Sequence, residues 1–164
     1  MTESIYTFKE LGADELSLLG ELFNYRDINE MIAGNRGRIL RGEISVFALF
    51  AGERLVGELR VAYEHEDAAF AVRGRRAYLY AFRVHRDLRG RGLGTRLLKE
   101  VLARLEKAGY TEFTVGVEDD NPRARELYRR FGFLSCVARR YEEYQGDGYE
   151  YDLLLKTVNE GEHL

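Results

Sequence analysis

A short glycine-rich stretch is the first part of the chain that is suited to chemistry. It reads Arg89-Gly90-Arg91-Gly92-Leu93-Gly94-Thr95. Glycine lets a bulky anion approach the main chain closely, and the first N–H groups of a helix have no carbonyl partner within that helix. A strand, this turn and a following helix would together form a phosphate-binding site. Taken alone, the same residues also fit an ordinary turn.

Two common phosphate-binding motifs do not fit this stretch. The P-loop requires a Lys and a Ser or Thr after its last glycine, and neither is in register here. The dinucleotide fingerprint requires a third glycine where Thr95 stands. The local charge still suits an anion, because the segment from Arg73 to Arg96 holds eight arginines and one acid, Asp87. A small polyanion is therefore a candidate ligand, and a solvated arginine surface is the alternative.

A second motif lies further along the chain, where residues 121–133 read NPRARELYRRFGF. Asn121 is a typical N-cap, and Pro122 suits the first helical position. The spacing of the next residues predicts one buried helical face that carries Ala124, Leu127, Tyr128 and Phe131. Tyr128 is therefore expected to point inward, with a hydroxyl that needs a partner. A core tyrosine and a chemically active one both fit this position.

The surrounding patterns indicate the elements that must position these two motifs. Strands are expected at residues 5–8, 46–50, 55–61, 77–84, 113–117, about 134–140 and 149–157. Helices are expected at 13–25, from 93 to about 109, from 121 to about 132, and as a short piece within the irregular stretch 27–41. Only residues 77–117 form a clean strand–helix–strand crossover. The order predicts a mixed α/β domain around one sheet.

Composition restricts the class of protein. The 164 residues are 45% hydrophobic and 32% charged, with a net charge of −3, which predicts one soluble domain over residues 1–164. The overall acidity argues against a nucleic-acid or membrane-surface partner. One cysteine, Cys136, fits a reducing compartment. No apolar run reaches the length of a membrane span, and the first residues lack the blocks of a signal peptide. We therefore expect a cytoplasmic protein.

The two motifs together resemble the signature segments of the GNAT N-acetyltransferases. The family pattern Q/R-x-x-G-x-G/A is matched by residues 89–94, and the pattern Asn-x-x-Ala-x-x-Leu-Tyr-x-x-x-Gly-Phe is matched by residues 121–133. The order of expected strands is similar over nearly the whole chain. The resemblance implies a mixed, mostly antiparallel sheet of six to seven strands, with helices on both faces and a splayed central strand pair.

The resemblance also implies a cofactor, acetyl-CoA, and residues that would hold it. The main chain of Phe82, Arg83 and Val84 would pair with the pantetheine arm. The amides of the turn would bind the pyrophosphate, from Arg89, Gly90, Arg91, Gly92, Leu93, Gly94 and Thr95. Asn121 would contact the pantetheine side, and the helix that it opens, with Ala124 and Tyr128, would line the cofactor. No metal is implied.

The implied reaction is direct transfer of the acetyl group to a primary amine. By resemblance, the Val84 N–H would stabilise the charge that grows on the carbonyl oxygen, and Tyr128 would protonate the departing thiolate. Some family members carry a glutamate base in the fourth strand, but residues 77–84 contain no acid. A water chain that ends at Glu58 or Glu118 is one substitute, although each reads more simply as a surface or strand-edge carboxylate.

Two other residues have side chains that could act in catalysis, but neither is expected to do so. His85 follows the strand and reads as a solvated turn residue. Cys136 lies at the start of an apparent strand and is expected to be buried as a small apolar residue. Direct transfer is therefore expected rather than an acetyl-enzyme.

The acceptor and the assembly state remain open at the level of sequence. Residues 27–41, 64–76 and the late turn near Gly146 are the expected acceptor-binding segments. A peptide amine and a small-molecule amine fit equally. An acyl-CoA-binding sensor of the same fold, without turnover, is the alternative function. The apolar run Leu153-Leu154-Leu155 is compatible with a homodimer and equally with a core strand.

Overall fold

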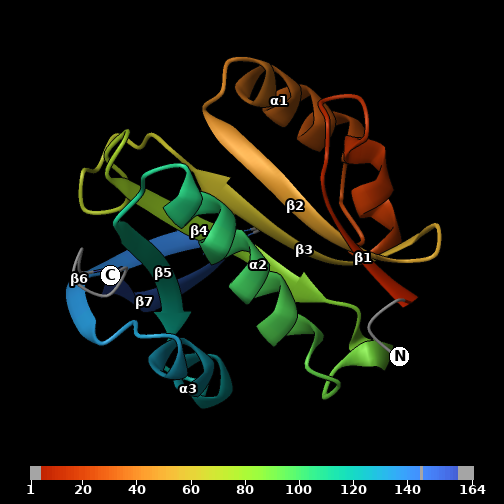
Figure 1. The fold of residues 1–164 in the computed structure, drawn as a ribbon. Helices are drawn as coiled ribbons and strands as arrows, with labels where there is room; N and C mark the ends of the chain where they lie inside the picture. Colours follow the sequence, from red (N-terminus) through yellow and green to blue (C-terminus); the bar gives the residue numbers. More distant parts are fainter. Residues whose placement is uncertain (1–4, 145, 159–164) are drawn as a thin grey trace. The chain divides into compact units, whose positions relative to one another are not determined.

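A computed structural model describes residues 5–144 and 146–158. Figure 1 shows the elements. In chain order they are β1 (Tyr6–Glu10), the 3-10 helix η2 (Leu16–Glu21), α1 (Ile28–Leu40), β2 (Ile44–Ala51), β3 (Arg54–Ala62), β4 (Arg76–Val84), the 3-10 helix η3 (Arg86–Leu88), α2 (Leu93–Lys107), β5 (Glu112–Glu118), α3 (Pro122–Arg130), β6 (Ser135–Tyr144) and β7 (Asp147–Thr157). The strands form one seven-stranded sheet in the order β1-β2-β3-β4-β5-β7-β6. This is the mixed, mostly antiparallel sheet that the resemblance implies.

The chain divides into two compact units, which are described one at a time. The first consists of the residues up to Ala62 together with Tyr80–Leu105, and the second of Tyr63–Leu79 together with the residues from Glu106 on. Strand β4 contributes to both. None of the helices in the described residues is long and apolar enough to cross a membrane.

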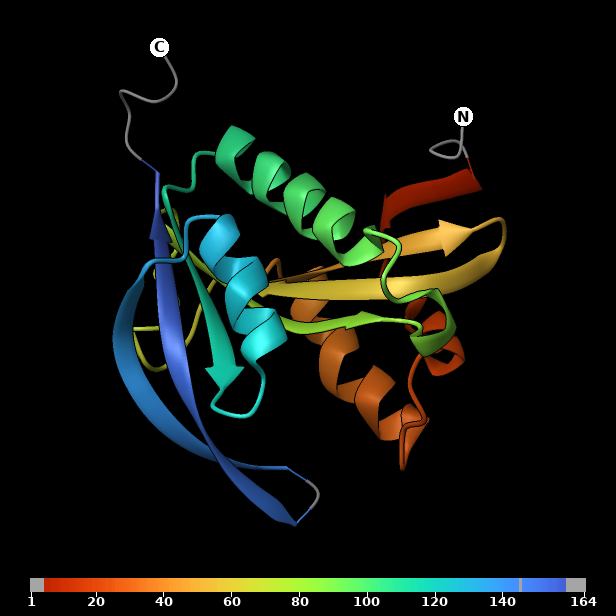
Figure 2. The same ribbon diagram turned by 90° about the horizontal axis from the view of Figure 1, so that it is seen from below.

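In the first unit, β1, β2 and β3 pair antiparallel, and two helices cover them. In the β1–β2 pair Tyr6 lies opposite Ala51, and in the β2–β3 pair Ile44 lies opposite Ala62. Figure 2 shows α1 and α2 on opposite faces of β2 and β3. The leucine stripe of α2 is buried as predicted, and it consists of Leu93, Leu97, Leu98, Val101, Leu102 and Leu105. A stripe of this spacing buries one side of the helix and fixes its orientation on the sheet.

The N-terminal helices differ from the expectation. Residues 13–25 form only the 3-10 helix η2, in which Leu16 and Leu19 are buried. Their spacing of three residues fits the three-residue turn of a 3-10 helix as well as it fits an α-helix. Residues 28–40, expected to be mostly irregular, form the regular helix α1. Its N-cap is Asp27, whose Oδ1 accepts from the Glu30 N–H at 3.1 Å.

In the second unit, β5, β7 and β6 pair antiparallel, and α3 lies beside them (Figure 2). The end of α3 is tied to β7, because Lys156 Nζ donates to the Phe131 carbonyl oxygen at 2.7 Å. The first residues of β4 pair with β5 in parallel, from Arg76 opposite Glu112 to Leu79 opposite Val115. These are the two strands that the predicted strand–helix–strand crossover connects.

A distortion interrupts β4 shortly after these pairs. Ala81 has φ of 51°, the one positive φ among the non-glycine residues that the structure describes. Positive φ in a strand residue other than glycine marks a bulge and costs free energy. Among the described residues, the registered pairs of β4 with β5 stop at Leu79, although β4 continues to Val84.

Candidate active site

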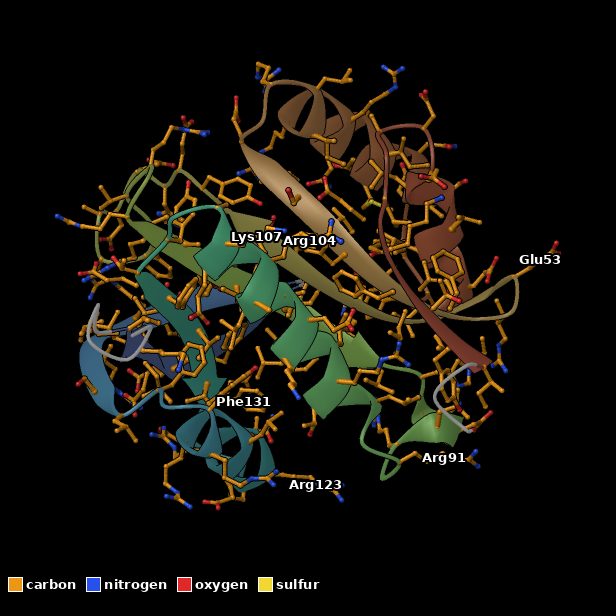
Figure 3. All side chains as sticks on the ribbon, in the orientation of Figure 1. Glu53, Arg91, Arg104, Lys107, Arg123 and Phe131 are labelled. Atoms are coloured by element: carbon orange, nitrogen blue, oxygen red, sulfur yellow. The ribbon has the colours of Figure 1, made fainter. Side chains whose placement is uncertain are left out.

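The turn that follows β4 has the backbone conformation that its glycines allow. Gly90 and Gly92 have φ of 80° and 78°, values that side chains rarely adopt. The side chains of Arg86, Arg89 and Arg91 are exposed around them. Figure 3 shows Arg91 on this turn, directed outward from the protein. The turn therefore combines main chain that an anion can approach closely with exposed cationic side chains, as an anion site requires.

Helix α2 starts at this turn without a side-chain cap. The Arg96 N–H donates to the Gly92 carbonyl oxygen at 3.0 Å, which makes Gly92 the N-cap. Glycine has no side-chain oxygen to accept from the first helical N–H groups. The N–H groups of Leu93, Gly94 and Thr95 have no carbonyl partner inside the helix. They point at the same end of α2, where the helix dipole favours negative charge.

Strand β4 delivers Val84 next to this helix end. A Cβ atom on Gly94 would lie 3.5 Å from Phe82 Cζ and 3.7 Å from Val84 Cγ2. The buried side chain of Leu93 forms a core cluster with Leu49 and Val56, against which Val84 and Leu88 pack. The start of α2 is therefore seated directly on the last residues of β4.

The main chain of Val84 points away from β3. The His85 N–H donates to the Val56 carbonyl oxygen at 2.7 Å, so His85 is hydrogen-bonded to β3. Because main-chain groups alternate along a strand, the N–H and C=O of Val84 face the opposite side. The carbonyl oxygen accepts from Arg89 Nε at 3.3 Å. The Val84 N–H can therefore donate a hydrogen bond to a group outside the β3–β4 pair.

The bulge at Ala81 sorts the following side chains onto two faces. In a regular strand Tyr80, Phe82 and Val84 would share one face. Here Phe82 and Val84 face α2, whereas Arg83 faces the α1 side and reaches Glu58, with Nη1 3.4 Å from Oε1. Tyr80 is also on that side, since its pKa responds to Arg60, Arg38 and Glu58. The side chains of β4 therefore lie in two different environments, an apolar one at the start of α2 and a charged one around Glu58.

Glu58 is at the centre of a buried ionic cluster, which we define as Tyr25, Glu58, Arg60 and Arg83. Glu58 is fully buried, and its Oε2 accepts from Arg60 Nε at 3.0 Å. Arg60 Nη2 donates to the Tyr25 hydroxyl at 2.6 Å. Burial raises the pKa of Tyr25, and the charge of Glu58 adds to the increase. The interpretation of Glu58 as a surface or strand-edge carboxylate was therefore wrong.

This cluster was missed because cross-strand pairing leaves no periodic signal in the sequence. One signal was present, however. Glu58 and Arg60 interrupt the otherwise apolar strand LVGELRVA, and charged residues inside such a strand are buried only when they are paired.

In the second unit, Tyr128 is directed inward from α3. Its side chain is 7% exposed, and burial raises its pKa to about 12. Its ring packs edge-on against Phe133, with centroids 5.7 Å apart. Asn121 caps the helix, because its Oδ1 accepts from the Ala124 N–H at 3.1 Å. The phenol is therefore neutral at ordinary pH, as a proton donor must be.

Seven of the eight arginines in the arginine-rich segment separate into two groups, and the eighth, Arg96, is half-buried in the first turn of α2. Four of the eight arginines are paired with acids: Arg73 with Glu64, Arg75 and Arg76 with Glu112, and Arg83 with Glu58. Arg86, Arg89 and Arg91 are exposed and form no ion pair among the described residues. Only this second group is available for an anion at the turn.

Three remaining residues fall outside both sites. Glu118 is exposed, and partial desolvation together with Asp120 raises its pKa. His85 accepts from the Asp87 N–H through Nδ1 at 3.2 Å and so caps η3. Cys136 is exposed, so the expectation of a buried thiol was wrong. It lies on the edge strand β6, beside an irregularity in its pairing with β7, where one side has no strand to cover it.

The predicted site residues are thus gathered in two places. Phe82, Val84 and residues 89–95 lie together in the first unit. Asn121, Ala124 and Tyr128 lie together on α3 in the second.

Comparison with solved structures supports the fold. The chain is similar to the ribosomal-protein-S18-alanine N-acetyltransferase from Escherichia coli, with 20% identity, a TM-score of 0.73, and 97% and 98% of the two chains covered. It is similar to yncA from Salmonella typhimurium, solved with its cofactor acetyl-CoA, with 17% identity, a TM-score of 0.70 and 95% of each chain covered. It is also similar to a spermidine N-acetyltransferase SpeG chimera from Vibrio cholerae and human SSAT, with 17% identity, a TM-score of 0.72, and coverage of 93% and 95%.

The family itself is established by sequence. No curated protein matches the chain. The model of the acetyltransferase (GNAT) family matches residues 11–133, which include the turn before α2 and the whole of α3. Since this match covers most of the chain and contains both motifs, the protein belongs to the acetyltransferase (GNAT) family.

Proposed function

We propose that this protein is an N-acetyltransferase that transfers the acetyl group of acetyl-CoA to a primary amine by direct attack, with the whole chain acting as one cytoplasmic acetyltransferase domain. The observation that carries the proposal is the N-terminus of α2. It is capped by a glycine, it follows a glycine turn, and it is seated against Val84. This arrangement leaves several N–H donors for an anion next to a strand end.

The residues present fit acetyl-CoA. The pyrophosphate would bind the N–H groups of residues 91–95, with Arg86, Arg89 and Arg91 as exposed countercharges. Gly94 keeps the approach to Val84 open, because a side chain there would lie beside Val84. The N–H of Val84 and the main chain of Phe82 would hold the pantetheine end. When bound, acetyl-CoA supplies a thioester whose acetyl group passes to the amine nitrogen as the C–S bond breaks.

Two groups of the protein would assist this transfer. The Val84 N–H is a fixed donor for the carbonyl oxygen, where negative charge increases during attack. Tyr128 holds a proton that it can give to the leaving sulfur, because burial keeps the phenol neutral. The amine must lose a proton, and residues 76–84 of β4 hold no acid to accept it. Water is our proposed acceptor for that proton.

The substitution Tyr128→Phe tests the proposal most directly. It removes one hydroxyl and keeps the buried ring. An acid catalyst contributes about 10²–10⁴ in rate, so kcat should fall by about that factor while the Kd for acetyl-CoA changes little. Turnover should be followed by chromatography of free CoA, because the exposed Cys136 would react with a thiol reagent.

The acyl-CoA sensor is the alternative, and the same experiment separates it. A sensor would bind acetyl-CoA, release no CoA with any amine, and respond to acetyl-CoA equally with Tyr or Phe at position 128. Absence of acetyl-CoA binding would contradict both readings.

A further inference from the structure

The buried ionic cluster carries more positive than negative charge. Glu58 is a single carboxylate between two guanidinium groups, those of Arg60 and Arg83. Arg38, whose charge acts to lower the pKa of the nearby Tyr80, lies 3.6 Å from Glu43, which Arg41 also contacts at 2.6 Å. Within the cluster itself, one positive charge is therefore left over. A buried excess charge is costly unless a counterion joins it.

Arg83 is the member of the cluster that an incoming group would meet. The Glu58 side chain is fully covered, whereas that of Arg83 is 27% exposed. The Arg83 guanidinium lies over the Phe23 ring, 3.8 Å from its centroid, which holds the plane of the group in place. Its Nη1 is buried without a hydrogen bond that meets normal geometry. Arg83 is therefore both oriented and incompletely satisfied.

Tyr25 offers a second donor beside it. The Tyr25 hydroxyl oxygen accepts from Arg60, so its own hydrogen is left to donate. Among the described residues, no acceptor for that hydrogen is found. A partly exposed guanidinium and an adjacent hydroxyl donor form a pattern that suits a carboxylate.

The position of Arg83 connects this cluster with the acyl-transfer site. Arg83 immediately precedes Val84, and because side chains alternate along a strand, theirs lie on opposite faces of β4. A ligand held by the Arg83 guanidinium would therefore lie on the α1 side of the strand whose Val84 N–H would bind the acetyl carbonyl oxygen. Neighbouring Cα atoms are about 3.8 Å apart. Carboxylate binding at Arg83 and acetyl transfer at Val84 would therefore lie within the length of one small molecule.

We propose that the cluster of Tyr25, Glu58, Arg60 and Arg83 binds a carboxylate of the acceptor, so that the substrate is an amine that also carries a carboxylate. This inference rests on the proposed acetyltransferase function and names its substrate class. Glu58 acts as a positioning residue that orients both guanidinium groups. The same excess charge repels polycations, so polyamines such as spermidine are poor acceptors.

The test compares acceptors that differ only in the carboxylate. α-Amino acids and ω-amino acids are each paired with the corresponding carboxamide, and spermidine is included. The wild-type kcat/KM should be at least about 10-fold higher for the best carboxylate than for its amide, as expected for hydrogen bonds to a charged group. Calorimetry with the protein saturated with CoA gives the same preference as a ratio of Kd values, without turnover.

Three variants assign the preference to the cluster. Tyr25→Phe removes one hydroxyl and should reduce the preference for carboxylate over amide several-fold, mainly through KM. Arg83→Met should abolish the preference, and Arg83→Lys should restore part of it, because the charge returns without the planar fork. Circular dichroism and thermal melting show whether each variant is folded, and Tyr25→Phe keeps the test valid if Arg83→Met does not fold.

The possible failures are distinguishable. If amides or spermidine are acetylated as well as the carboxylates, the inference is overturned and the acetyltransferase proposal stands. The same holds if the variants keep the wild-type preference. If acetyl-CoA does not bind and no amine is acetylated, the proposed function and this inference fail together.

Discussion

Nη1 of Arg83 lies 3.4 Å from Oε1 of Glu58, and Tyr80 lies on the same side of β4, whereas a regular strand would place residues 80 and 83 on opposite faces. Ala81, with its positive φ of 51°, lies between them and accounts for the difference. The conformation of one backbone position therefore determines which side chains of β4 face the buried cluster.

Substitution of Glu58 should be costly for folding. Glu58→Gln keeps the shape of the side chain but leaves Arg60 and Arg83 without a countercharge. Loss of one partner of a buried charge pair costs about 3–5 kcal/mol, so the free energy of unfolding in urea should fall by about that amount. The matched control is Glu53→Gln at the exposed tip of the β2–β3 hairpin (Figure 3), where a change within about 0.5 kcal/mol is expected. Equal effects at both positions would contradict the buried cluster.

Tyr128 should make stability depend on alkaline pH. Its pKa is about 12 in the folded protein and 10.0 without burial. A raised folded pKa contributes stability that is complete below pH 10 and is lost as pH rises toward 12. A shift of this size corresponds to about 2–3 kcal/mol. The difference in unfolding free energy between wild type and Tyr128→Phe should therefore change across pH 10–12. Parallel curves for the two proteins would show that the phenol is not buried.

Substitutions of two glycines in the turn should affect protein stability and acetyl-CoA binding differently. Gly94 has space for a Cβ at ordinary contact distance, 3.5 Å from Phe82. Gly94→Ala should keep or raise stability by up to about 1 kcal/mol. It should weaken acetyl-CoA binding about tenfold, the loss expected for one crowded hydrogen bond. Gly90→Ala, at φ of 80°, should instead destabilise the protein by about 1–2 kcal/mol. Thermal melts and calorimetric titration with acetyl-CoA measure the two effects.

Cys136 should be dispensable for catalysis although it is exposed. Direct transfer requires no acetylated protein, so Cys136→Ser should retain kcat within about twofold of wild type, as for surface changes away from a site. Mass spectrometry after incubation with acetyl-CoA alone should detect no acetyl group on the catalytic time scale. A stoichiometric acetyl adduct that disappears when the amine is added would instead establish a covalent intermediate.

Periodic and capped elements were predictable from the sequence. The leucine stripe of α2 and the Asn121–Pro122 start of α3 are local signals, and both helices lie where these signals indicate. Helix α1 was expected only as a short piece without bounds, because it buries none of its residues and contains two glycines, which left no apolar stripe to detect. Its one reliable signal was the capping residue Asp27.

The site was predictable only where chemistry depends on local sequence. The Gly-rich turn and Tyr128 depend on short motifs, and the structure gives each the expected local form. The Glu58 cluster depends on pairing between strands and on a bulge, neither of which has a spacing in the sequence. The predicted roles of Val84 and Asn121 toward the cofactor stay predictions.

The N-cap of helix α2, Gly92, has no side chain to accept from the first helical N–H groups, and this has a consequence for the lifetime of the protein. An anion bound at Gly92 would complete the helix in place of a side chain. Ligand present at 100 times its Kd adds about 2.7 kcal/mol to the free energy of unfolding. Protease resistance should therefore increase with the supply of acyl donor, so the amount of folded protein in the cell would follow the metabolic state that feeds its reaction.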